Sequence, residues 1–178
     1  MVRETPYGIK IKYVSALLVA IKLAAPAYAV TPEALDMEIK ASDERTVLSK
    51  YYDSSEWVNH ILPGIKSGAG PWLRIATQLR RNSDAGASED IDFALYAAMP
   101  LRPFAVIEAL GGANKKQTER ICNISFEADL PSEGVFVYLN RIRTALLQAK
   151  TAHEKLLAAA CRKGLIKAEL QAKRDGLP

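Results

Sequence analysis

The residue types that most often carry out catalysis are sparse in this chain, and they do not form a recognisable catalytic set. The 178 residues include two histidines and two cysteines. We expect His60 to be a half-buried helix residue, while His153 falls on an apolar stripe typical of a core position. Neither a His-Glu-x-x-His zinc motif nor a Gly-x-Ser-x-Gly nucleophile motif is present. The sequence therefore predicts a protein that is not an enzyme and uses no cofactor.

One acidic stretch, residues 84–92, has the composition of a calcium loop but the wrong spacing. An EF-hand places acidic ligands at loop positions one, three and five and a glutamate at position twelve. With Asp84 as position one, positions three, five and twelve are Gly86, Ser88 and Leu95, none of which is acidic. We therefore predict no metal site here and assign the stretch to a loop and helix start, with Asp84 and Ser88 as alternative caps.

The two cysteines are best explained as a disulfide. Cys122 and Cys161 are the only cysteines, and no Cys-x-x-Cys motif of a redox exchanger is present. An even cysteine count in an exported protein favours a disulfide. Two buried thiols or one catalytic cysteine are the alternatives at this stage.

Residues 1–29 have the three parts of a secretory signal peptide. Arg3, Lys10 and Lys12 form a basic start, residues 13–21 are apolar, and Ala27-Tyr28-Ala29 offers a cleavage site. An uncleaved membrane anchor is the alternative, although the segment is shorter than the roughly 20 apolar residues that span a bilayer. The interpretation is a signal peptide over 1–29, a periplasmic location in a Gram-negative bacterium, and one helical domain over 30–178.

Removal of this leader makes the chain nearly neutral, but its charge is unevenly distributed. The mature part has 20 basic and 19 acidic residues. Residues 30–100 carry a net charge of −4 and residues 101–178 a net charge of +5. The average gives no basic surface of the kind that binds nucleic acid. The favoured interpretation is that the two halves complement one another inside the fold, and attraction of an acidic partner or anionic surface is the alternative.

Apolar residues recur every three or four positions along most of the mature chain, which predicts an all-α fold. We expect short antiparallel helical hairpins closed by one long C-terminal helix. The segments 125–129 and 134–138 are the alternatives as strands. The helices are expected over 31–52, from Ser54 or Ser55 to a stop at Pro63-Gly64, over 70–81, from Asp84 or Ser88 to 99, over 103–110, over 115–124, and over 132–162 with a break at Gly164.

Loops between packed helices are the usual places for recognition. The candidate partner-binding residues are Ser67, Trp72, Asp84 and Ala87. For Trp72, a place in the core of a helical hairpin is the favoured interpretation, and an exposed contact is the alternative.

A family resemblance rests on residues in the middle of the chain: Trp72-Leu73, Ile75-Ala76, Leu79, Ser83-Asp84-Ala85-Gly86, Ser88-Glu89, Ala94-Leu95, Ala97-Ala98, Pro103, Val106-Ile107 and Ile121-Cys122. Over about residues 57–125, the chain resembles a loose group of small exported proteobacterial proteins that are uncharacterised, all-helical and carry a cysteine pair. It also resembles, more distantly, the periplasmic immunity proteins that protect cells from toxins delivered by type VI secretion, which are compact, helical and non-catalytic.

These observations predict a periplasmic, non-catalytic protein that binds another protein. The resemblance implies an immunity or inhibitor protein whose partner is a toxin or other effector. The alternative is an envelope accessory or stress protein whose basic C-terminal helix associates with an anionic surface. Neither interpretation includes an integral membrane segment after cleavage.

Overall fold

The computed structural model describes residues 30–126 and 130–178, and these residues are helical without strands. The predicted signal peptide, residues 1–29, and part of the first strand alternative lie outside the described residues. The all-α prediction is confirmed, because residues 135–138 of the second strand alternative belong to a helix and Gly134 is its N-cap. The elements are α1 (Pro32–Ala41), α2 (Glu44–Tyr51), the π-helical turn η1 (Trp57–Ile61), α3 (Leu62–Lys66), α4 (Gly70–Arg80), α5 (Ala85–Ala98), α6 (Pro103–Ala109), α7 (Lys115–Ile121), α8 (Val135–Leu146) and α9 (Ala152–Arg174).

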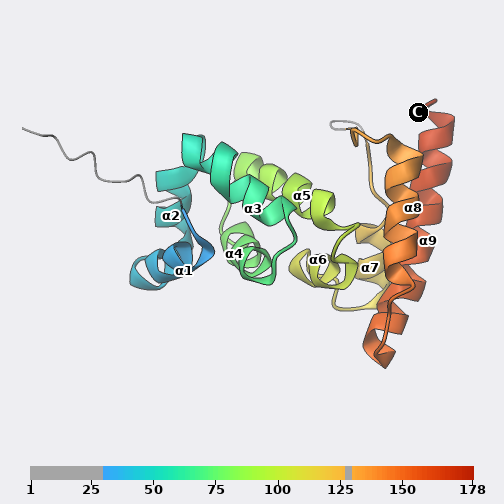
Figure 1. The fold of residues 1–178 in the computed structure, drawn as a ribbon, viewed down its shortest axis with the longest axis horizontal. Helices are drawn as coiled ribbons and strands as arrows, with labels where there is room; N and C mark the ends of the chain where they lie inside the picture. The colour runs from blue at the N-terminus through green and yellow to red at the C-terminus, as the bar shows by residue number, and fades with distance from the viewer. Residues whose placement is uncertain (1–29, 127–129) are drawn as a thin grey trace, which may run out of the picture.

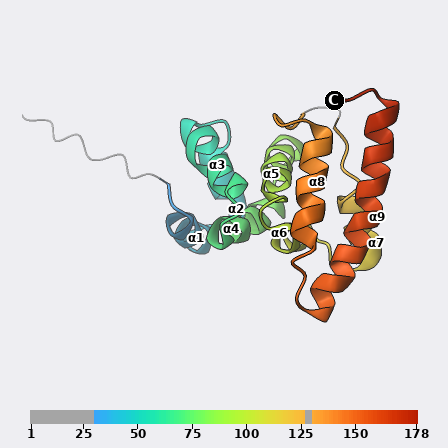
Figure 2. The same cartoon turned by 45° about the vertical axis from the view of Figure 1, so that its right-hand side comes forward.

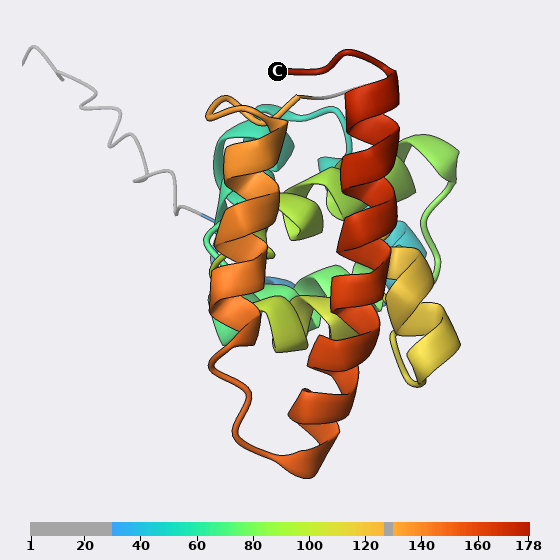
Figure 3. The same ribbon diagram turned by 90° about the vertical axis from the view of Figure 1, so that its right-hand side faces the viewer.

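The helices succeed one another from one end of the molecule to the other. Helices α1 and α2 lie at one end, α3, α4 and α5 lie in the middle, and α8 and α9 form the opposite end (Figures 1 and 2). Helix α9 is the outer helix of that end, with α8 on one side and the short α7 on the other (Figure 3). Buried apolar side chains from Leu35 to Ala172 form one continuous core cluster.

The first helical segment is two helices rather than the single helix expected over 31–52. Thr31 caps α1 as expected, since its hydroxyl accepts a hydrogen bond from the N–H of Ala34. The chain then breaks at Ser42, and the Asp43 carboxylate caps α2 by accepting from the N–H of Thr46 at 2.8 Å. The apolar spacing continues across this break, so the local preference of aspartate for a cap overrides it.

The prediction that Pro63 and Gly64 end a helix is wrong. The backbone N–H of Leu62 donates to the carbonyl of Trp57, five residues earlier, and the chain continues as α3 to Lys66. Proline inside an α-helix removes one hydrogen bond and crowds the preceding turn, and the wider π turn accommodates it. Gly64 serves close packing, because a Cβ there would lie 2.8 Å from Cζ2 of Trp72.

The C-terminal helix begins and ends later than expected. Instead of one helix over 132–162, the chain forms α8, a loop at 147–151, and α9, which continues to Arg174. A capping box starts α9, in which the Thr151 hydroxyl accepts from the N–H of Glu154 and the Glu154 carboxylate accepts from the N–H of Thr151. This reciprocal pair of hydrogen bonds favours a new helix start over continuation of α8.

Gly164 was expected to break this helix, and instead it lies buried inside α9. A Cβ at this position would lie 2.7 Å from the backbone carbon of Cys122 and would also meet the carbonyl oxygen of Glu119. The glycine therefore allows the backbones of α7 and α9 to approach closely.

The predicted disulfide is confirmed. Cys122, directly after α7, is bonded to Cys161 in the middle of α9, and both residues are fully buried. The bond links segments that are 39 residues apart in sequence. It therefore fixes α7 against α9 beside the glycine contact.

Candidate functional site

Both histidines are exposed, which differs from the sequence expectation. His60 lies on the solvent side of η1 rather than half-buried. His153 lies in the first turn of α9, where its Nε2 is 3.8 Å from a carboxylate oxygen of Glu108. The apolar periodicity predicts a core position for His153 only if one helix continues through residues 147–151. Helix α8 ends before these residues, so α9 has a different register. Among the described residues, no group of three or more His, Cys, Asp or Glu side chains is arranged to hold a metal ion.

Two of the candidate partner-binding residues lie where α3 joins α4. The exposed Ser67 donates its hydroxyl to the carbonyl of Gly64 at 2.5 Å and accepts from the N–H of Ala69 at 3.2 Å. Trp72 is half-buried, with its ring lying over Gly64. Ser67 therefore closes the turn, and Trp72 packs two consecutive helices together.

The other two candidates lie at the start of α5. Asp84 is its N-cap and accepts from the N–H of Ala87 at 3.0 Å. Ala87 is buried, with an exposed fraction of 2%, so its side chain has little surface to offer to a partner.

The two pairs of candidates do not form one surface. The turn that contains Ser67 and Gly68 lies against Ala98 and Arg102, at the C-terminal end of α5. Asp84 lies at the N-terminal end of the same helix. The 14 residues of α5 separate these two ends by about 21 Å.

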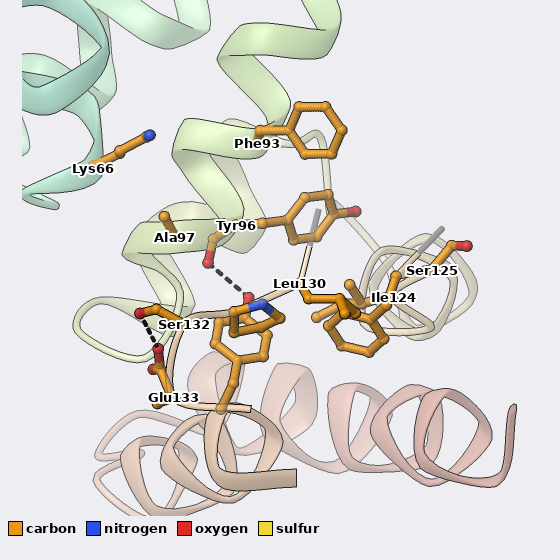
Figure 4. A pocket seen from close by; sticks show the side chains of 12 residues that line it. Lys66, Phe93, Tyr96, Ala97, Ile124, Ser125, Leu130, Ser132 and Glu133 are labelled. Carbon is orange, nitrogen blue, oxygen red and sulfur yellow. Dashed lines mark hydrogen bonds between the residues drawn. The ribbon is translucent and has the colours of Figure 1, made fainter. Parts of the chain in front are cut away.

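One surface hollow is an aromatic cleft between α5, the segments 124–126 and 130–133, and the start of α8. Its volume is about 370 Å³. Phe93 and Tyr96 project from α5 toward Ile124 and Leu130 across the cleft (Figure 4). This lining is suited to an apolar group.

The phenol groups of this cleft hold the fold together. Tyr138 donates its hydroxyl to the carbonyl of Tyr96 at 2.7 Å, and Tyr96 donates to the carbonyl of Ile121 at 3.2 Å. Burial raises the pKa of Tyr96 to about 12 and also raises the pKa of Tyr138. Both phenols are therefore protonated at neutral pH and act as hydrogen-bond donors between helices.

This burial predicts loss of stability in alkali. The pKa of Tyr96 is higher in the folded chain than its ordinary value of 10. Its contribution to stability is therefore complete below pH 10 and is lost as the pH rises toward about 12. We expect the free energy of unfolding, measured with urea, to fall across this range, and to fall less in Tyr96→Phe. An equal fall in the two proteins would contradict the assignment to Tyr96.

Another hollow lies at the α8–α9 end, where basic side chains gather. Helices α7 and α9 together carry nine lysines and arginines against three glutamates. A groove runs between α7 and α9, in two adjoining parts of about 760 and 390 Å³ that share Asn123 and Lys167. We call it the α7–α9 groove. Its lining residues are Asn114, Lys115, Lys116, Gln117, Glu119, Arg120, Asn123, Ile124, Ser125, Lys167, Leu170, Gln171 and Arg174.

The groove has a positive surface with one internal ion pair. Lys167 lies 2.6 Å from the carboxylate of Glu119, and its hydrogen bond, together with the nearby charge of Lys163, lowers the pKa of Glu119. Lys115, Lys116 and Arg120 are exposed and form no ion pair within the described part of the chain. The net potential along the groove therefore favours an anionic ligand.

The charges of the two halves are not used to hold the halves together. Of the seven ion pairs that lysine or arginine forms within residues 30–126 and 130–178, three join residues of 30–100 and four join residues of 101–178. No pair among these described residues connects one half to the other. The favoured sequence interpretation, internal complementation, is therefore not supported by the ion pairs. The excess of basic residues in 101–178 indicates from the sequence that this half has a positive surface. The location of the groove on that surface depends on how α7 packs against α9.

No described helix has the length and apolar character required to cross a bilayer. In comparisons with known proteins, no protein-family model, curated protein or solved structure matches the chain.

Proposed function

We propose that this chain is an exported, non-catalytic binding protein that holds a protein partner at its α7–α9 end. The observation that carries the proposal is the gathering of exposed basic side chains along the α7–α9 groove. Long-range attraction between complementary charges steers partners to such surfaces and orients them. An immunity or inhibitor role fits this arrangement, because blocking a toxin requires a rigid surface and no chemistry.

Rigidity at this end supports the proposal. The disulfide joins α7 to α9, and Gly164 lets the two backbones pack closely. A surface whose backbone is already fixed loses little conformational entropy when it binds. The groove is therefore preorganised by the features that stabilise the fold.

Export is part of the proposal and has its own test. The disulfide fits an oxidising compartment, where such bonds persist. We expect the chain to be recovered from the periplasmic fraction with Val30 as its first residue and no titratable thiol. Recovery from the cytoplasm with Met1 retained and two reactive thiols would contradict export.

Co-purification from the periplasm tests the binding proposal. The full-length gene is expressed with a C-terminal tag, and the retained proteins are quantified by mass spectrometry. We expect one partner in a near one-to-one ratio, lost when Lys116 and Arg120 are changed to glutamate. Retention of the partner by that variant would place the interface elsewhere, and the absence of any stoichiometric partner would contradict the proposal.

Association with an anionic surface is the second candidate, and a specific observation favours it. Ile166 is 53% exposed on α9, near Lys163 and Arg162, and does not line the groove. An exposed aliphatic residue beside basic ones is typical of helices that lie on anionic bilayers. Salt-sensitive binding to phosphatidylglycerol vesicles, lost in Ile166→Ser and kept in Met37→Ser, would support this candidate over the first.

A further inference from the structure

The α7–α9 groove has a shape and a lining that define its ligand more narrowly than charge alone. Its first part is lined by α7 and by Lys167 of α9, and its second part by residues 123–125 and by α9, so a ligand in either part contacts two segments of the chain. The outer side of α9, where Ile166 lies, is a separate surface that does not line the groove. A flat bilayer can contact that outer side, whereas a narrow chain can enter the groove.

One free amide side chain lies between the basic ones, at the junction of the two parts of the groove. Asn123 lines both parts, and its amide group forms no hydrogen bond among the described residues. The amide oxygens of Gln117 and Gln171 already accept hydrogen bonds from Asn114 and Arg174. The Asn123 amide offers both a donor and an acceptor, which match the N–H and C=O groups of an extended peptide backbone. Inorganic phosphate and lipid headgroups present acceptors mainly, so they would leave the Asn123 oxygen without a donor.

The second part of the groove adds an apolar contact. Ile124 and Leu170 line it beside Lys167 and Arg174. Leu170 is 54% exposed. A ligand that combines carboxylates with one aliphatic side chain would therefore match both parts.

The length of the groove sets the size of the ligand. The stretch from Asn114 to Asn123 spans about 14 Å at the helical rise per residue. The second part follows Lys167 to Arg174, about 10 Å along α9. An extended chain advances about 3.3 Å per residue, so about four residues would follow the first part and about three the second.

We propose that the α7–α9 groove binds an extended, carboxylate-rich polypeptide segment of the partner, with an aliphatic side chain placed against Leu170. This inference rests on the proposed function and names the chemistry of the bound segment. The carboxylates pair with Lys115, Lys116 and Arg120, and the Asn123 amide pairs with the backbone of the segment.

A binding assay with a defined peptide tests the inference. The probe is a fluorescein-labelled ten-residue peptide of glutamates with one central leucine, titrated with the full chain purified from the periplasm while fluorescence anisotropy is recorded. We expect saturable binding that weakens as salt is added, because exposed charge pairs are screened. A peptide with glutamine in place of every glutamate should not bind.

Matched charge reversals locate the binding. Lys116→Glu/Arg120→Glu removes two basic groups from the groove, and Lys155→Glu/Arg162→Glu makes the same change of charge on α9 outside it. We expect the first variant to weaken peptide binding at least about tenfold, or about 1.4 kcal/mol, and the second to change it much less. Circular dichroism checks that both variants are folded.

Several outcomes would overturn the inference. Equal weakening in the two variants would mean attraction by net charge alone. Binding of phosphatidylglycerol vesicles but not the peptide would assign the groove to a membrane surface. A partner that co-purifies through the groove, together with no peptide binding, would leave the proposed function standing and reject the acidic segment as its ligand.

Discussion

Removal of the Cys122–Cys161 disulfide is expected to lower the free energy of unfolding by about 4 kcal/mol. The bond closes a loop of 39 residues, and opening it restores conformational entropy to the unfolded chain. Domains of this size have a total stability of about 5–15 kcal/mol, so the loss is a large share. The measurement is urea unfolding of Cys122→Ala/Cys161→Ala against the wild type. Alanine is the replacement because both positions are fully buried.

The double variant should lose more than stability. Cys122 follows α7 directly, and Cys161 lies in α9. We therefore expect faster backbone hydrogen exchange in α7, while exchange in α1 and α2 at the far end changes little. A loss below about 1 kcal/mol, with α7 equally protected in both proteins, would mean that packing alone holds the two helices together.

Gly164→Ala is expected to cost about 3 kcal/mol. The added Cβ would lie 2.7 Å from the backbone carbon and 2.8 Å from the Cβ of Cys122, and it would meet the backbone oxygen of Glu119. Backbone atoms held by a disulfide cannot move aside as a flexible side chain can. Helix propensity by itself favours alanine over glycine, so the expected loss runs against the ordinary trend.

Gly70→Ala is the matched control for this substitution. Gly70 is the first residue of α4, and a Cβ built there has no atom within 4 Å other than those of its chain neighbours. We expect Gly70→Ala to lower the unfolding free energy by less than about 1 kcal/mol, because the added Cβ is crowded only by the ring of Pro71, which follows it. A destabilisation of Gly164→Ala no larger than that of Gly70→Ala would contradict the close approach of α7 and α9.

Local cap and turn residues made the middle of the fold predictable. Pro71 and Pro103 lie in the first turns of α4 and α6, and Asp84 caps α5, as their types indicate. The disulfide followed from two cysteines in a chain with a signal-like leader. These features depend on neighbouring residues or on composition, so they do not require the fold to be known.

The errors arose where local and long-range effects compete. Asp43 ends the periodic segment because its carboxylate caps a new helix, although the apolar spacing continues. Gly164 has the local character of a helix breaker, and its role depends on α7, more than forty residues earlier. His153 is exposed because the capping box at Thr151 starts a new helix after a loop.

The candidate site was only partly accessible from the sequence. The positive charge of residues 101–178 is visible in the composition. Ser67 and Asp84 are predicted to contact a partner only because they lie in loops, which often bind partners. The structure places them at opposite ends of α5. The groove depends on two helices that are distant in sequence and joined by the disulfide, so the sequence alone does not predict its lining residues.

Site-specific photo-crosslinking tests the central claim most directly. Benzoylphenylalanine is introduced at Gln117, which lines the groove, and in a second protein at Val58, which is 59% exposed on η1. After irradiation of intact cells, we predict one covalent adduct to an acidic segment of a partner protein from position 117 and none from position 58. An adduct from position 58 alone, equal adducts from both positions, or no adduct from position 117 would contradict the account.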